Sequence, residues 1–177
     1  MADVPLETLC ELMRHMEWAD AHVWRAIRAH PAAGQDERIC ALLHHYHGVQ
    51  RAFLTLWSVQ PFAPPAADTP ELWATEAAVR DYYRELHAAM AVFDDAALRR
   101  PIVMPGLEPY EKQMGRTFDR PGLAETVLQV ASHSTHHRGQ VIARLRELGT
   151  TPPLVDYIAW IWFGRPAPNW SSTPAAV

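Results

Sequence analysis

Six histidines stand in two short clusters of this 177-residue chain, and their spacing suits the binding of a metal ion. His133, His136 and His137 lie within one stretch of helical pattern. Residues four positions apart on an α-helix lie one turn apart on the same face, so the imidazoles of His133 and His137 can reach one ion. An upstream cluster at 44–47 could provide a third nitrogen ligand.

The position of each downstream histidine around its helix narrows the choice. At about 100° per residue, His137 lies near the centre of the apolar face and His133 lies at its edge. His136 falls nearly opposite, where it faces solvent. The periodicity therefore favours the pair His133 and His137 over any pair that includes His136.

The upstream cluster leaves an alternative open. Its helix has an apolar face centred near Tyr46, which places His45 and His47 on opposite flanks, each about 100° away. His44 lies almost behind that face and is the weakest candidate. Periodicity alone does not choose between His45 and His47.

The elements that must position these histidines are helical. Apolar residues recur at helical spacing in four long segments and in a short, very apolar one: 6–29, 36–58, 70–97, 120–148 and 153–163. Prolines and glycines exclude a long helix from 98–120, where residues 101–104 and 114–118 could pair as a short hairpin.

The pattern predicts an all-α four-helix bundle with a short fifth helix and an irregular connection before the fourth long helix. Residues 1–165 are predicted to form a single domain, and residues 166–177 an irregular tail. Bundles of this kind place metal sites between facing helices, on side chains that project inward.

Composition excludes several classes of partner. A net charge of −4 without a basic stripe argues against a nucleic acid partner. No apolar run approaches the length of a membrane span, and the first residues lack the pattern of a signal peptide. These features predict a cytoplasmic protein without a membrane or nucleic acid partner. The expected partner is a small-molecule substrate.

Three neutral imidazoles suit several divalent ions, and fewer than four protein ligands leave positions for water or substrate. That arrangement is typical of catalytic rather than structural sites. The zinc-protease motif HExxH is absent, because residue 134 is serine where the motif needs glutamate. Glycine-rich phosphate loops and the GxSxG motif are absent as well.

Four stretches resemble one known family. His133-Ser-Thr-His-His-Arg-Gly-Gln140 closely resembles the HxxHHRGQ motif of the DinB/YfiT-like family of damage-inducible, metal-dependent proteins. The other three stretches agree with family patterns in the same order along the chain: Trp18-Ala19-Asp20, Leu43 to Gln50, and Pro152 to Tyr157.

The resemblance implies a four-helix bundle that often forms a homodimer, and a divalent metal, zinc or nickel most often, on three histidines. Carried over by position, these are His133, His137 and His45, with His47 as the alternative. The apolar segment 153–163 also favours a homodimer. Characterised relatives of this fold include enzymes that depend on a low-molecular-weight thiol.

Three functions follow as hypotheses. The first, favoured on the resemblance, is a metal-dependent S-transferase that joins a low-molecular-weight thiol to small electrophiles, with Arg138 and Arg116 as contacts for carboxylates of the thiol. The second is a hydrolase that uses metal-bound hydroxide, with Glu17, Asp20 or Glu125 as the base. The third is a non-catalytic metal-binding stress-response protein.

Overall fold

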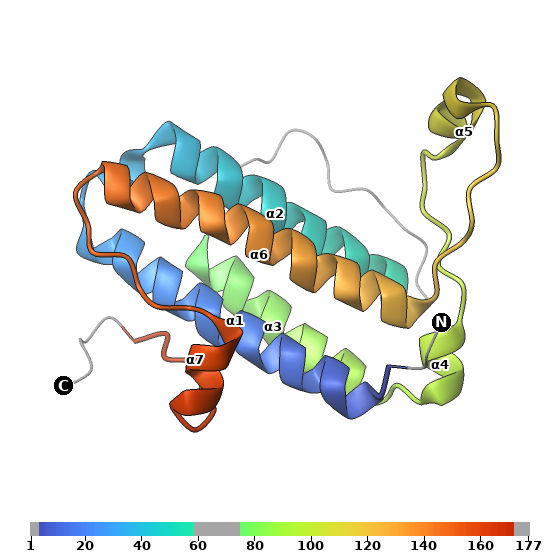
Figure 1. The fold of residues 1–177 in the computed structure, drawn as a ribbon, viewed down its shortest axis with the longest axis horizontal. Coiled ribbons are helices and arrows are strands. Elements are labelled where there is room, and N and C mark those ends of the chain that lie inside the picture. The colour runs from blue at the N-terminus through green and yellow to red at the C-terminus, as the bar shows by residue number, and fades with distance from the viewer. Residues whose placement is uncertain (1–3, 59–74, 172–177) are drawn as a thin grey trace.

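The computed structural model of the protein describes residues 4–58 and 75–171, and these residues are mostly helical (Figure 1). They form seven α-helices and one 3-10 turn: α1 (Leu6–Ala29), the turn Ala33–Gln35, α2 (Glu37–Trp57), α3 (Glu76–Met90), α4 (Asp95–Arg99), α5 (Glu108–Met114), α6 (Leu123–Glu147) and α7 (Tyr157–Trp162). The described ranges contain no strand, only an isolated bridge between Pro101 and Gly122. The all-α prediction is confirmed.

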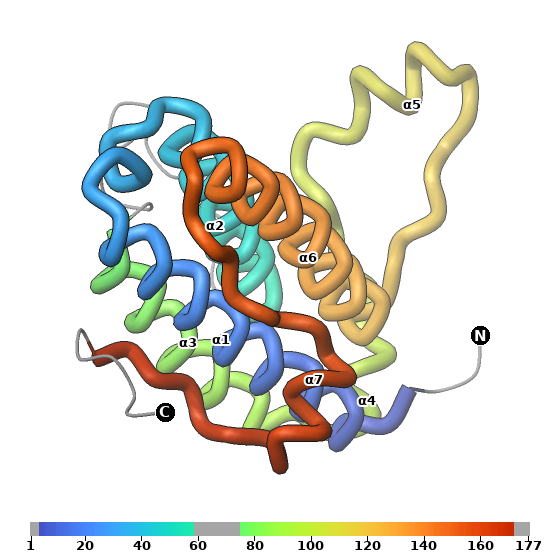
Figure 2. Tube along the Cα trace, turned by 60° about the vertical axis from the view of Figure 1, so that its left-hand side comes forward, coloured from blue at the N-terminus to red at the C-terminus, as the bar shows by residue number. Residues whose placement is uncertain are grey.

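Four helices enclose the core. Helix α6 packs against α1 and α2, and α3 packs against the same two helices from the other side (Figures 1 and 2). An ion pair between Asp36 and Arg144 at one end, and a hydrogen bond from Trp57 to Thr126 at the other, show that α2 and α6 run antiparallel. Within the described ranges, no helix has both the length and the apolar character that crossing a membrane requires.

The bounds of three long helices were predicted to within three residues. Asp36 caps α2 as expected, since its side chain accepts a hydrogen bond from the amide of Ile39 at 3.0 Å. The predicted third helix, 70–97, was too long. Helix α3 ends at Met90, and Asp94 caps the separate helix α4 by accepting from the amide of Ala97. The start of that prediction, and the proline-rich stretch 59–69, include residues outside the described ranges.

The predicted hairpin was wrong. Residues 108–114 form the helix α5, with Pro109 in its first turn, where a missing amide hydrogen costs nothing. Gly115 ends that helix with φ 66°, a left-handed conformation that glycine adopts easily. The connection projects beyond the four-helix core, and α5 contains no buried residue (Figure 1).

The last helix begins later than predicted. Prolines 152 and 153 leave the chain extended, and α7 begins at Tyr157 rather than at 153. Residues 150–156 run back across the bundle from the end of α6 (Figure 2). Nε2 of His15 on α1 lies 2.9 Å from the carbonyl oxygen of Val155, which ties this segment to the bundle.

Candidate metal centre

Three histidines meet where α2 packs against α6. His45 of α2 faces His133 and His137, which lie one turn apart on α6, and one nitrogen from each ring lies within 4.8 Å of the others. The ring centroids are 4.4 Å apart for the α6 pair and 4.5–5.0 Å apart between α2 and α6. The chain thus brings together three ligands of the type that divalent transition metals prefer.

These rings are suited to hold a cation. Burial, together with charge repulsion from the neighbouring histidines, lowers the pKa of His133 to about 4. Partial desolvation lowers the pKa of His45 as well, and so does charge repulsion from His137. Neutral imidazoles keep a lone pair for a metal. Nε2 of His133 is buried without a hydrogen-bond partner among the described residues, a costly state that a bound ion would relieve.

Gln140 orients the third ring. Its Oε1 lies 2.8 Å from Nδ1 of His137, and its Nε2 lies 3.2 Å from Nε2 of His136. An amide oxygen only accepts, so Nδ1 of His137 carries the hydrogen in this contact and Nε2 keeps its lone pair. Sequence reasoning missed Gln140, although its position three residues after His137 puts both side chains on one helix face.

His47 points away from this cluster and into the core, where it is 4% exposed. The indole of Trp24 donates to its Nε2 at 3.2 Å, and its Nδ1 donates to Oε1 of Gln50 at 2.8 Å. Both ring nitrogens are therefore engaged, which removes His47 as the alternative ligand in this structure. His44, also from the upstream cluster, does not join the group of three.

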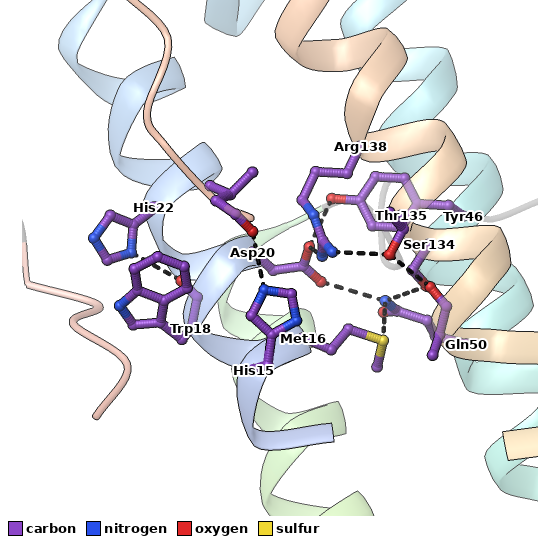
Figure 3. A network of polar contacts seen from close by, with 12 residues as sticks. His15, Met16, Trp18, Asp20, His22, Tyr46, Gln50, Ser134, Thr135 and Arg138 are labelled. Atoms are coloured by element: carbon purple, nitrogen blue, oxygen red, sulfur yellow. Dashed lines mark hydrogen bonds and ion pairs between the residues drawn. The ribbon is translucent and has the colours of Figure 1, made fainter. Parts of the chain in front are cut away.

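A buried polar network lies between α1, α2 and α6 (Figure 3). Asp20 of α1 is fully buried and accepts from Arg138 at 2.8 Å, from the hydroxyl of Tyr83 at 2.5 Å and from Gln50 at 3.3 Å. Gln50 also donates to the hydroxyl of Ser134 on α6 at 3.0 Å. One carboxylate thus connects α1 to the three other long helices of the bundle.

The carboxylates suggested as a general base have other partners. Asp20 is enclosed in that network. Glu17 pairs with His87 at 2.7 Å. Glu125 accepts from the amide of Gly122 at 2.7 Å and so caps the start of α6, two turns or about 12 Å along the helix from His133. None of the three joins the histidine cluster.

The two arginines suggested as thiol contacts do not join it either. Arg138 is 2% exposed and pairs with Asp20, so its charge is neutralised inside the bundle. Arg116 lies on the projecting connection, where its guanidinium stands 5.7 Å from the ring centre of Phe118. The structure gives neither residue the proposed contact.

Outside the cluster, His15 is 5% exposed and packs edge-on against Tyr157. Burial is the largest influence on its pKa and lowers it, with Arg138 acting in the same direction. Its contact with Val155 and the charges of Asp20 and Asp156 oppose this shift without cancelling it. The folded protein therefore holds His15 neutral at pH values where an unfolded histidine, with a pKa of about 6.5, is already charged.

This difference predicts how stability depends on pH. The contribution of His15 is complete above about pH 6.5 and is lost as the pH falls from there towards its lowered pKa. We expect His15→Gln to reduce the slope of the free energy of unfolding against pH by up to about 1.4 kcal/mol per unit below pH 6.5. Urea unfolding at a series of pH values, with a chelator present, measures this slope. The substitution His136→Gln, at an exposed histidine, is the control. An unchanged slope in His15→Gln would contradict the assignment.

The fold and the cluster together define a four-helix bundle protein with a candidate three-histidine metal centre. The DinB family model matches residues 4–168, nearly the whole chain, so the protein belongs to the DinB family. Comparison with curated proteins and with solved structures found no match.

Proposed function

We propose that the protein is a metal-dependent enzyme that holds one divalent ion on His45, His133 and His137 and transfers a low-molecular-weight thiol to small electrophiles. The observation that carries the proposal is the unpartnered, buried Nε2 of His133 beside two further imidazoles. Zinc or nickel is the ion that the family resemblance favours. Such an ion would lower the pKa of a bound thiol, so that a thiolate is available at neutral pH.

The residues around the cluster support a site that is open to small molecules. His45 is exposed, and His133 and His137 are half-buried, so the cluster lies at the edge of the bundle rather than in its core. Gln140 holds His137 in the tautomer that presents Nε2. In the transfer, the thiol proton passes to solvent, sulfur bonds to the electrophilic carbon, and the leaving group departs with its electron pair.

The surroundings of the three histidine rings favour a transferase over a hydrolase, because none of the three suggested carboxylates lies beside the cluster. Attack by water profits from a general base within hydrogen-bond reach of the nucleophile. Glu17, Asp20 and Glu125 each have a different structural partner. A divalent ion held by the three histidines would favour the thiolate form of a low-molecular-weight thiol, which would then not depend on such a base. This argument, together with the family resemblance, places the transferase first.

A homodimer is part of the proposal. Trp162 at the end of α7 and Phe163 directly after it are 74% and 59% exposed, and Ile158 on α7 is half exposed. Large apolar side chains gathered on one short helix are typical of a subunit contact. Sedimentation equilibrium at micromolar concentration tests this, and a monomer throughout would remove the homodimer from the proposal.

The function is tested by incubating zinc- or nickel-loaded protein with glutathione, mycothiol, bacillithiol or cysteine and a panel of alkyl and aryl halides. We expect loss of thiol that depends on the metal, disappears in His137→Ala and persists in the exposed control His136→Ala. A cobalt-loaded sample should gain a sulfur-to-metal absorption band when the productive thiol is added. Turnover of esters or lactones without thiol would favour the hydrolase, and full metal loading without any turnover would favour the non-catalytic protein.

A further inference from the structure

A cavity lies on the other side of α6, away from the histidine cluster. It has a volume of about 390 Å³, is partly open to solvent and is lined by α1, α6 and the segment 153–157. Its α6 wall includes Thr135, Gly139 and Ile142, which stand roughly opposite His133 and His137 around the helix axis. The size falls within the range of cavities that bind small molecules, about 300–1,000 Å³.

Buried polar side chains build the inner end of this cavity. Arg138 is 2% exposed and is fixed by Asp20 at 2.8 Å and by the hydroxyl of Thr135 at 3.2 Å. His15 is 5% exposed and is held against the carbonyl of Val155, so it fastens the segment that forms the outer wall. Fixed contacts therefore hold the inner end of the cavity in place.

A glycine keeps the α6 wall open. Gly139 lies in the middle of a 25-residue helix, where glycine costs about 1 kcal/mol relative to alanine. A Cβ atom built at Gly139 would meet no other atom within 4 Å, so close packing inside the protein does not require glycine there. Its missing side chain instead leaves space for a molecule to approach the helix.

The charges at the cavity indicate what kind of molecule fits. Arg146 on α6 and Asp156 before α7 line it, and neither side chain has a hydrogen bond or an ion pair to any other described residue. A molecule with only a negative charge would be repelled by Asp156, and a molecule with only a positive charge would be repelled by Arg146. A molecule that carries both charges could pair with both residues. Other wall residues, among them Leu12 and Ile142, are apolar.

We propose that this cavity binds a small zwitterion with an apolar body, of the class of the apolar α-amino acids. Its carboxylate pairs with Arg146 and its ammonium group with Asp156. Its side chain lies between α1 and α6, next to Gly139. This binding site is separate from the proposed metal centre and does not depend on it.

The probes are L-leucine and L-phenylalanine, titrated into the full chain and followed by calorimetry and by saturation-transfer NMR. We expect both to bind the wild type. Leucinamide lacks the carboxylate, N-acetyl-leucine lacks the ammonium group and glycine lacks the apolar body, so each should bind at least about tenfold more weakly, as expected for one lost contact of about 1.4 kcal/mol. Failure of both amino acids to bind at concentrations up to about 10 mM would overturn the proposal.

Variants separate the cavity from the rest of the protein. Arg146→Gln should weaken leucine binding about tenfold or more, and Gly139→Leu, which fills the cavity, should abolish it. Gly139→Ala is the matched control, because it leaves most of the space and should bind leucine within a few fold of the wild type. Equal binding by Arg146→Gln and the wild type would overturn the proposal even if Gly139→Leu failed to fold. Metal content should be the same in Arg146→Gln and the wild type, so failure here leaves the metal centre unaffected.

Discussion

Replacing Asp20 by alanine is expected to lower the free energy of unfolding by about 3–5 kcal/mol, because it leaves a buried arginine without its counter-charge. Asp20 and Arg138 are 0% and 2% exposed and lie 2.8 Å apart. The substitution also removes the acceptor for the hydroxyl of Tyr83 and for Gln50. Chemical unfolding followed by circular dichroism measures the loss, which is a large part of the 5–15 kcal/mol that is typical of a domain.

A surface pair provides the matched control. Asp81 pairs with Arg84 at 2.7 Å on α3, but both side chains are more than half exposed. Asp81→Ala should therefore change the free energy of unfolding by less than about 1 kcal/mol. The double variant Asp20→Leu with Arg138→Met removes both buried charges and should recover part of the stability lost in Asp20→Ala. A loss below 1 kcal/mol in Asp20→Ala would show that the network is not what connects the helices.

The same network shows where sequence reasoning failed. Asp20, Gln50 and Arg138 stand at positions whose helical neighbours are apolar, for example Val141 three residues after Arg138. A polar residue at such a position is either a functional group or one partner of a buried structural pair. Only the partner on another helix decides between them, and periodicity within one helix carries no information about that partner. Asp20 was therefore read as a base and Arg138 as a ligand contact, although each neutralises the other.

For a related reason, helical periodicity did not decide between His45 and His47 as the third ligand. A helical wheel gives the angle of each side chain from Tyr46 but does not say which neighbouring helix lies on which flank. In the fold, α6 lies on the flank of His45, and Trp24 of α1 lies on the flank of His47. The family resemblance contained this information, because it placed one position of α2 in correspondence with the histidines of α6.

Helices α1, α2 and α6 were predictable because their apolar faces repeat over five or more turns. The connection 98–120 was harder, because its helices are only one or two turns long and α5 has no buried face to leave a periodic pattern. The signals that were present are local. A capping residue at Asp94 marks the start of α4. Pro109 marks the first turn of α5, and Gly115 marks its end. Together these residues would have predicted two short helices.

Removing a metal ligand should have the largest effect on the proposed function. Wild-type protein, untagged and reloaded with zinc or nickel, should hold about one ion per chain, and His137→Ala should hold almost none, because two imidazoles remain where a catalytic site has at least three protein ligands. Mass spectrometry of the metal gives the stoichiometry. An ion that binds only the folded state also raises its stability, so a chelator should lower the melting temperature of the wild type but not that of His137→Ala.

The variant Gln140→Ala tests whether metal binding depends on the orientation of the His137 ring. Gln140→Ala leaves all three ligands in place and removes the acceptor that orients His137, together with a contact to His136, which is not a ligand. Metal affinity should therefore fall about 10- to 100-fold without loss of stoichiometry at saturation. His136→Ala removes a histidine beside His137 that lies outside the group of three and should retain the metal. Equal loss in His136→Ala and His137→Ala would indicate general binding by a histidine-rich surface. A graded series, with His137→Ala weakest, Gln140→Ala intermediate and His136→Ala near the wild type, requires a site in which ring orientation matters.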